Sequence, residues 1–136
     1  MAKPSADLIR GIPMFSELDD SSVSQLADDF MEREFAEGQS LATEGEGGLN
    51  FFVVESGSVD VSVGGEVVAT LGPGASFGEV ALVDKSARSA TVTATSPMVA
   101  YALPVWSFRP FVEQRPELAW KLLEILAERL RVANTR

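Results

Sequence analysis

The feature that most constrains the fold is a series of short strand-like segments, cut by glycine, between residues 34 and 103. Residues 58–63, SVDVSV, alternate with a period of two, so their three valines share one face. Gly64-Gly65 is typical of a tight hairpin, and residues 66–71, EVVATL, form the returning strand. Many short strands with turns at this spacing favour a barrel or a double-sheet jelly roll.

Three further segments extend this pattern. Residues 49–55, LNFFVVE, have the continuous apolar character of a buried strand. Residues 89–96, SATVTATS, alternate small apolar residues with threonines, and residues 98–103, MVAYAL, form the last strand. The sequence therefore predicts a mainly β protein, with a jelly roll (a double-stranded β-helix) over residues 34–104.

Helical patterns flank the strands on the N-terminal side. Residues 19–30, DDSSVSQLADDF, open with capping residues and then place apolar residues at three- and four-residue spacing, as in an amphipathic helix. Before them, residues 12–15, IPMF, are predicted to form a turn with its apolar side chains directed inward. We assign residues 1–33 to a helical entry.

The C-terminal part, residues 105–134, is predicted to form closing helices. The first, residues 105–114, is expected to bend or break at Pro110, and Pro116 occupies the first turn of a longer helix. Two apolar faces follow on the longer helix. One has four-three spacing and the other lies beside it: Ala119, Leu123, Leu126, Leu130 and Ala133; Leu118, Leu122 and Ile125. The first stripe can serve as core packing, as a lid over a ligand, or as the interface of a homodimer or an effector domain.

Length and charge limit the classes of function. The chain has 136 residues, the size of one domain, and 46% of them are hydrophobic. Its net charge of −9 argues against general binding to nucleic acid or to anionic lipid. No apolar run reaches the roughly 18 residues that a membrane span requires, and the first residues lack the apolar segment of a signal peptide. We therefore expect a cytoplasmic location.

Two residue types are missing from the sequence. The chain has no cysteine, which excludes disulfides, zinc–thiolate sites and a cysteine nucleophile. It has no histidine either, so the usual general base and the usual metal ligand are absent. Binding is thus favoured over catalysis, and we expect no enzymatic activity, no metal and no cofactor.

One segment indicates a binding site. Residues 77–92, FGEVALVDKSARSATV, place Glu79 and Arg88 among small and apolar residues. Gly78 permits a close backbone approach, and free amides near Ala81, at a helix start, favour an anion. Arg88 offers a planar set of donors suited to phosphate oxygens. A carboxylate such as Glu79 repels a phosphate but accepts hydrogen bonds from a neutral hydroxyl, such as a ribose 2′-OH. The pattern therefore indicates a nucleotide pocket, with too few cationic groups for a triphosphate.

This segment resembles the phosphate-binding cassette of cyclic nucleotide-binding domains, with Gly-Glu, Ala-Leu and Arg-x-Ala in register. The resemblance extends over most of the chain. IPMFSELDD resembles the family's helical entry, VVESGSVDV its glycine-turned strand pair, and RPELAWKLLEILAERL its closing helix. The family includes catabolite activators and regulatory subunits of protein kinase A, and its fold is a β-jelly-roll with helices at both ends. The resemblance implies that residues 1–136 form one such sensor domain.

The resemblance also implies roles for individual residues. Arg88 would hold the cyclic phosphate with the backbone amides of Ala81 and Ser89, Glu79 would hold the ribose hydroxyl, and Gly78 would make room. Base contacts are expected from the closing helix at Leu126, Leu130, Ala133 and Asn134, of which only Asn134 can hydrogen-bond a purine edge. Besides the candidates Leu126, Leu130 and Ala133, the ligand-binding residues that we expect are Phe77, Gly78, Glu79, Val80, Ala81, Leu82, Arg88, Ser89, Ala90 and Asn134.

Some positions depart from the family's pattern. Many members have Gly or Pro just before the arginine, where this chain has residues 84–87, DKSA, with a charge pair at the lip of the pocket. Members selective for cGMP often have threonine after the arginine, so Ser89 favours cAMP. No helix-turn-helix follows the closing helix within this sequence, so we expect no direct DNA binding. The chain is either a standalone sensor or a piece of a longer protein.

Two other interpretations remain open at this stage. Glu79 and Arg88 can pair with each other across the loop as a structural salt bridge. The chain can also be a degenerate member of the family, which keeps the fold, binds no nucleotide and acts as a protein-interaction module.

Overall fold

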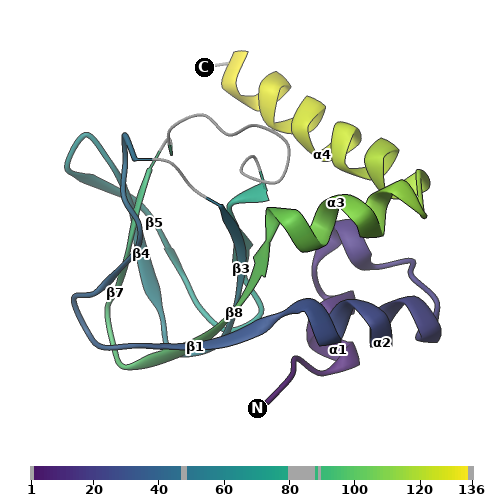
Figure 1. Cartoon of the computed structure of the whole chain (residues 1–136). Helices are drawn as coiled ribbons and strands as arrows, with labels where there is room; N and C mark the ends of the chain where they lie inside the picture. The colour runs from purple at the N-terminus through teal and green to yellow at the C-terminus, as the bar shows by residue number, and fades with distance from the viewer. Residues whose placement is uncertain (1, 47–48, 80–87, 89, 135–136) are drawn as a thin grey trace.

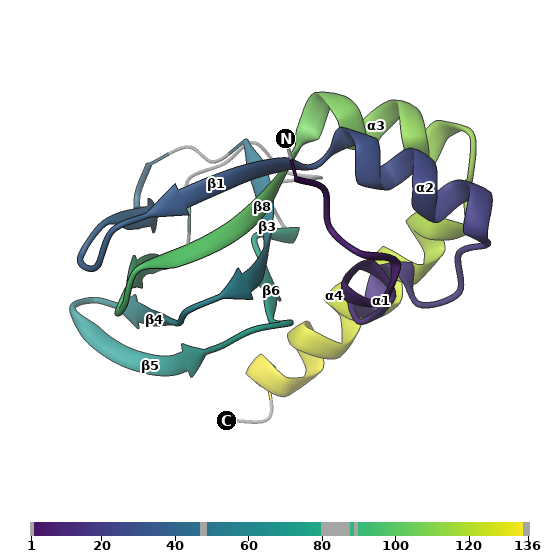
Figure 2. The same ribbon diagram turned by 90° about the horizontal axis from the view of Figure 1, so that it is seen from below.

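The computed structural model describes residues 2–46, 49–79, 88 and 90–134 (Figure 1). The strands form one part of the molecule and the helices gather at one end of it, as both ribbon views show (Figures 1 and 2). The elements are, in chain order, α1 (Ala6–Arg10), the 3₁₀ turn η1 (Pro13–Phe15), α2 (Asp20–Asp29), β1 (Met31–Phe35), β2 (Ser40–Ala42), β3 (Asn50–Ser56), β4 (Val59–Val63), β5 (Glu66–Leu71), β6 (Ser76–Phe77), β7 (Thr91–Ala94), β8 (Met98–Pro104), α3 (Val105–Glu113) and α4 (Glu117–Asn134).

The described strands form two four-stranded antiparallel sheets. Their orders are β1-β8-β3-β6 and β2-β7-β4-β5, so strands distant in sequence lie side by side in both sheets. The predicted jelly roll with flanking helices is thereby confirmed. Each predicted strand coincides with an observed one to within about two residues, and β5 spans the predicted residues 66–71.

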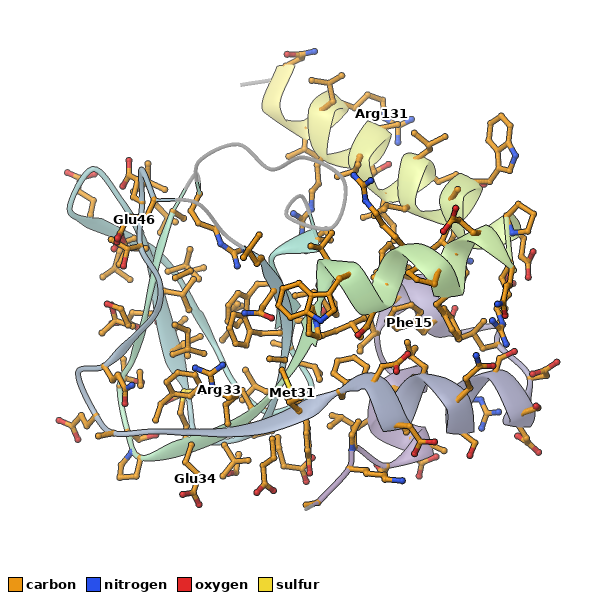
Figure 3. All side chains as sticks on the ribbon, viewed as in Figure 1. Phe15, Met31, Arg33, Glu34, Glu46 and Arg131 are labelled. Atoms are coloured by element: carbon orange, nitrogen blue, oxygen red, sulfur yellow. The ribbon has the colours of Figure 1, made fainter. Side chains whose placement is uncertain are left out.

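Strand β1 begins inside the segment that we assigned to the helical entry. Met31 pairs with Ala102 and Phe35 with Met98, so the jelly roll starts a few residues earlier than predicted. The sequence of this strand, MEREF, is mostly charged and mostly exposed, so it lacks the alternation that would have identified it. Met31, Arg33 and Glu34 are labelled along β1 in Figure 3.

Strand β3 separates two apolar cores, which explains why its sequence is continuously apolar. Phe52 and Val54 pack between the sheets, whereas Phe51 and Val53 pack against the helices. The core between the sheets includes Phe35, Ala42, Phe52, Val54, Val59, Val92, Ala94, Met98 and Ala100. The core under the helices includes Ile9, Ile12, Met14, Phe15, Leu26, Phe51, Val53, Leu103, Phe108, Phe111, Leu118 and Leu122. The inward turn predicted for residues 12–15 is confirmed, since Ile12, Met14 and Phe15 are buried.

Polar contacts fix the helices to one another. Asp19 accepts a hydrogen bond from the backbone amide of Ser22 at 2.8 Å and so caps α2. Hydrogen bonding to the backbone and the side chain of Ser22 holds the pKa of the Asp19 carboxyl below its ordinary value. Arg115, between α3 and α4, donates to the Ser22 hydroxyl at 2.9 Å and to the Gln25 side chain at 2.8 Å. The closing helices are therefore tied to the entry helices.

Helix α3 is continuous, so of the bend or break predicted at Pro110 the break does not occur. Pro110 lies inside Val105–Glu113. Proline lacks the amide that would donate to the carbonyl of Trp106 one turn earlier. Both residues are exposed, so water can satisfy that carbonyl and the missing bond costs the helix little.

Helix α4 buries a different face from the one we singled out. Leu118 and Leu122 are buried, whereas Leu123 and Leu130 are 54% and 63% exposed. In the stripe beginning at Ala119, Leu126 packs against the core, whereas Ala119, Leu123 and Leu130 are exposed. The two faces are offset by a single residue, and both satisfy helical spacing, so the sequence could not tell which one meets the strands. In the described part of the chain, no helix combines the length and the apolar character needed to cross a membrane.

Candidate functional site

The expected site begins at the short strand β6. Pairing of Phe77 with Phe52 and of Ser76 with Val53 brings the end of β6 beside the start of β3. The rings of Phe77 and Phe52 stack with their centroids 5.2 Å apart and 24° between their planes. Strand pairing and this stack therefore fix where the next residue, Gly78, leaves the sheet.

Gly78 and Arg88 are in direct contact. Gly78 has φ +91°, a conformation that residues with a side chain rarely adopt. A Cβ atom added there would lie 2.7 Å from Nη1 of Arg88 and 3.0 Å from the carbonyl oxygen of Asn50. The guanidinium of Arg88 and the backbone of Asn50 therefore leave no room for a side chain at residue 78.

Arg88 is held from several sides. Its Nη2 donates to the carbonyl oxygen of Asn50 at 2.7 Å. Its backbone amide donates to the carbonyl of Glu46 at 2.7 Å, and its carbonyl accepts from the amide of Gly45 at 3.0 Å. Burial lowers the pKa of the Arg88 guanidinium from its ordinary value, although arginine stays protonated at neutral pH. A half-buried, partly desolvated cation is suited to an anionic ligand.

Glu79 is the one charged residue among the described buried side chains. Its carboxylate forms an ion pair with Arg129 of α4. The side chain of Glu79 is 7% exposed and that of Arg129 is 57% exposed, so the pair lies at the edge of the interior. The described ion pairs do not include one between Glu79 and Arg88, whose guanidinium bonds to a backbone carbonyl instead. The interpretation of these two residues as a mutual salt bridge is therefore not supported.

The structure brings together only some of the expected site residues. Phe77, Gly78, Glu79 and Arg88 lie at one place, where β6 ends beside β3. Ala90 is half-buried just before β7. Four expected residues lie outside the described part of the chain: Val80, Ala81, Leu82 and Ser89.

The residues expected to contact a base are spread along α4. Asn134 is exposed at its last position, and Leu130 is exposed as well. Leu126 is half-buried and lines a groove between α3 and α4, not the cavity beside Glu79. The side chain of Ala133 lies outside the described part. In this arrangement the residues of α4 beside Glu79 are Leu122, Ile125 and Arg129.

The sequence did not identify Arg129 or Asn50 as site residues. A signal for Arg129 was available in the sequence. It follows Leu122 and Ile125 at helical spacing, so it lies on the same face of the helix as the residues that contact the core. Asn50 accepts from Arg88 through its backbone, which no side-chain pattern reveals. Its amide oxygen is buried without a hydrogen-bond partner among the described residues, and leaving a buried acceptor unsatisfied costs about 1–3 kcal/mol.

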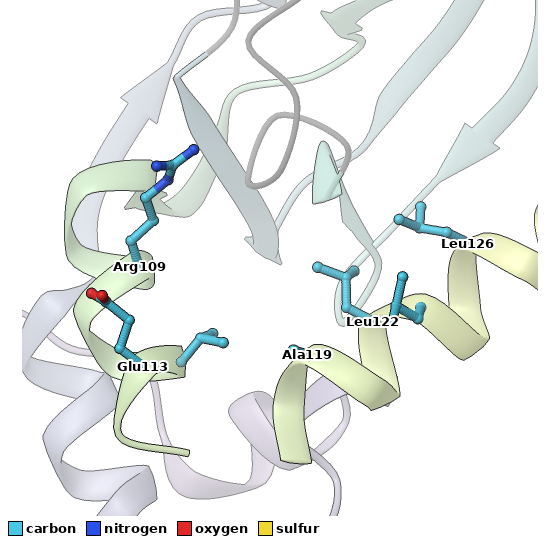
Figure 4. A pocket seen from close by; sticks show the side chains of 7 residues that line it. Arg109, Glu113, Ala119, Leu122 and Leu126 are labelled. Carbon is cyan, nitrogen blue, oxygen red and sulfur yellow. The ribbon is translucent and has the colours of Figure 1, made fainter. Parts of the chain in front are cut away.

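A larger groove lies between α3 and α4. It encloses about 470 Å³ and is lined mainly by apolar residues. Figure 4 shows Arg109 and Glu113 on α3, and Ala119, Leu122 and Leu126 on α4 across the groove. Of the stripe on α4, Ala119, Leu123 and Leu126 line this groove, whereas Glu79 lines the smaller cavity on the other side of Leu122.

Comparison with known proteins gives the family. Residues 32–115 match the family described as the cyclic nucleotide-binding domain. The match includes the whole cassette segment and covers more than half of the chain. The chain therefore belongs to the cyclic nucleotide-binding domain family.

Two curated relatives are longer than this chain. A cAMP-dependent protein kinase regulatory subunit of Yarrowia lipolytica is 38% identical over 96 residues, 71% of this chain and 26% of that protein. Glutaminase 2 of Bradyrhizobium diazoefficiens is 34% identical over 128 residues, 90% of this chain and 20% of that protein. The chain thus spans about a quarter or less of these relatives.

Two solved structures share the fold. The N-terminal domain of a transcriptional regulator from Streptomyces coelicolor A3(2) has a TM-score of 0.78 and 35% identity, covering 95% of this chain and 93% of that one. The catabolite activator protein of Thermus thermophilus has a TM-score of 0.81 and 31% identity, covering 90% of this chain and 60% of that one.

Proposed function

We propose that this chain is a sensor domain that binds a cyclic mononucleotide and does not catalyse a reaction. Arg88 holds the cyclic phosphate, and the carboxylate of Glu79 accepts a hydrogen bond from the ribose 2′-hydroxyl. Binding changes the surface that the domain presents to a partner. That partner is a second copy or an effector domain at the C-terminal helix.

The observation that carries this proposal is the setting of Arg88. Its guanidinium is half-buried, is fixed by the carbonyl of Asn50, and lies against a glycine that admits no side chain. Its charge is not matched by an ion pair among the described contacts, so an anionic ligand would supply the missing counter-charge. The cassette pattern around it lies within the segment that matches the family.

Two observations favour cAMP over cGMP. The relative from Yarrowia lipolytica is named as cAMP-dependent. Ser89 also stands where members selective for cGMP often have threonine. We expect the preference to be modest, because serine still offers a hydroxyl group, on a shorter side chain.

Calorimetric titration of the purified chain with cAMP, cGMP and 5′-AMP tests the proposal. We expect saturable heat with both cyclic nucleotides, tighter binding of cAMP, and weak or no binding of 5′-AMP, whose phosphate carries an additional charge and is not cyclised. Tighter binding of cGMP would contradict the preference. Absence of heat with both cyclic nucleotides at millimolar concentration would contradict the function.

The alternative is a family member that binds no nucleotide and acts through protein contacts. The exposed apolar stripe of α4 is the observation that favours it, since Leu123 and Leu130 are more than half exposed. The same titration separates the two functions.

A further inference from the structure

A short turn that follows β2 holds the backbone of Arg88 at both its amide and its carbonyl. The turn consists of residues 43–46 and is closed by a hydrogen bond of 3.1 Å from the amide of Glu46 to the carbonyl of Thr43. The amide of Gly45 donates to the carbonyl of Arg88 at 3.0 Å, and the amide of Arg88 donates to the carbonyl of Glu46 at 2.7 Å. The position of the Arg88 backbone therefore follows the position of this turn.

Glu44 attaches the turn to the sheet β2-β7-β4-β5. Its backbone amide donates to the hydroxyl of Thr91, on β7, at 2.9 Å. Its side-chain Oε1 accepts a hydrogen bond of 3.0 Å from the amide of Gly64, between β4 and β5. These two partners are 47 and 20 residues away in the sequence. One exposed acid thus connects the turn to two parts of the sheet that are distant in sequence.

The charge of Glu44 and its hydrogen bonds have opposite effects on an anion at Arg88. None of the ion pairs of the described residues includes Glu44, so its carboxylate keeps its full negative charge. A free carboxylate repels a phosphate, although water and salt weaken this repulsion for an exposed group. The hydrogen bonds instead keep the turn in place, and with it the backbone of Arg88. The sign of the change in affinity on removal of the side chain therefore shows which effect is larger.

We propose that Glu44 is a positioning residue for the candidate nucleotide site and that it acts through Arg88. This inference rests on the proposed function and adds to it a residue that works without contacting the nucleotide. Because Glu44 ties the turn to Thr91 and Gly64, the backbone of Arg88 is ordered before a ligand arrives. The ligand then loses no affinity to the ordering of that segment.

The test compares three variants by titration with cAMP. Glu44→Ala removes both the acceptor and the charge, whereas Glu44→Gln removes only the charge. Glu66→Ala is the control, because Glu66 is an exposed acid close to Gly64 in sequence whose side chain has no described hydrogen bond or ion pair. We expect Glu44→Ala to bind cAMP about two- to tenfold more weakly than wild type, the factor that corresponds to one hydrogen bond, and the other two variants to bind it at least as tightly as wild type.

Three results of this titration would overturn the inference and leave the proposed function intact. The first is unchanged or tighter binding by Glu44→Ala, which would mean that repulsion is the larger effect. The second is equal weakening in Glu44→Gln, which keeps an acceptor for the amide of Gly64. The third is equal weakening in Glu66→Ala. Absence of cAMP binding by wild type would instead overturn the proposed function, and the inference with it.

Amide hydrogen exchange without ligand supplies the second measurement. Exchange at the amides of Gly45 and Arg88 should be faster in Glu44→Ala than in wild type, and unchanged in Glu44→Gln. Unchanged exchange at both amides in Glu44→Ala would overturn the inference.

A second pair of variants applies if Glu44→Ala does not fold, which circular dichroism shows. Thr91→Val removes the hydroxyl that accepts from the amide of Glu44, and it should speed exchange at Arg88 and weaken cAMP binding by a similar factor. Thr93→Val is its control, since Thr93 lies on the same strand and its hydroxyl has no described hydrogen bond. Equal effects of the two substitutions would overturn the inference.

Discussion

Substitution of Gly78 by alanine should disturb both the fold and the site. The residue has φ +91°, so a side chain there carries backbone strain of about 1–2 kcal/mol. The new Cβ would also lie 2.7 Å from Nη1 of Arg88, which must move away. If the guanidinium leaves the carbonyl of Asn50, a charge-assisted hydrogen bond is lost, which contributes about 1.5–3 kcal/mol.

The two costs can be separated with Gly65→Ala. Gly65 has φ +85° but no heavy atom within 4 Å of an added Cβ, so that variant carries the strain alone. Urea unfolding should show a loss of about 2.5–5 kcal/mol for Gly78→Ala and about 1–2 kcal/mol for Gly65→Ala. Titration with cAMP should show at least tenfold weaker binding only for Gly78→Ala, about 1.4 kcal/mol. Equal losses of stability and unchanged binding in both variants would refute this reasoning.

Three further predictions concern stability. Leu122→Ala should lower the free energy of unfolding by about 2–5 kcal/mol and Leu123→Ala by less than about 0.5 kcal/mol, because only Leu122 is buried. Equal losses in chemical unfolding would mean that the wrong face of α4 is assigned to the core. Gly57→Ala should lower the melting temperature more than Gly78→Ala or Gly65→Ala, since its Cβ would lie 2.4 Å from that of Met98. A smaller decrease than in those variants would count against this close packing of Gly57 on Met98. Asp19→Ala should destabilise the chain at neutral pH. The folded-state pKa of Asp19 is lowered, so its contribution is present above the ordinary pKa of 3.8 and is lost as pH falls through the lower folded value. Melting curves of wild type and variant should therefore converge below that pH, and a constant difference would contradict the capping role.

The strands were predictable because their pattern and turns are local. The valines of residues 58–63 and the glycines after them identified a hairpin that the structure confirms as β4 and β5. Strand β1 escaped notice because its charged side chains conceal its pairing with β8. Such pairing depends on contacts across about 70 residues, which no short window of sequence displays.

The candidate site was predictable in part. The cassette pattern identified Gly78, Glu79 and Arg88, and the structure places Gly78 and Arg88 in contact. The ion pair of Glu79 with Arg129 was not foreseen, because it depends on which of two neighbouring faces of α4 meets the strands. That choice follows from the tertiary packing of Leu118 and Leu122.

The central claim is that Arg88 binds the cyclic phosphate. Thermal unfolding of wild type, Arg88→Ala and Arg33→Ala with and without cAMP tests it most directly, because Arg33 is an exposed arginine on β1 whose loss changes the net charge equally. Two charge-assisted bonds of about 1.5–3 kcal/mol each predict that Arg88→Ala weakens cAMP binding by about two to four decades. At a ligand concentration of about 100 times the wild-type Kd, wild type and Arg33→Ala should gain about 2.7 kcal/mol, and Arg88→Ala almost nothing. Glu79→Ala should lose less affinity, since it removes one hydroxyl contact and relieves repulsion of the phosphate. If cAMP stabilises Arg88→Ala as much as wild type, the account of the site is wrong.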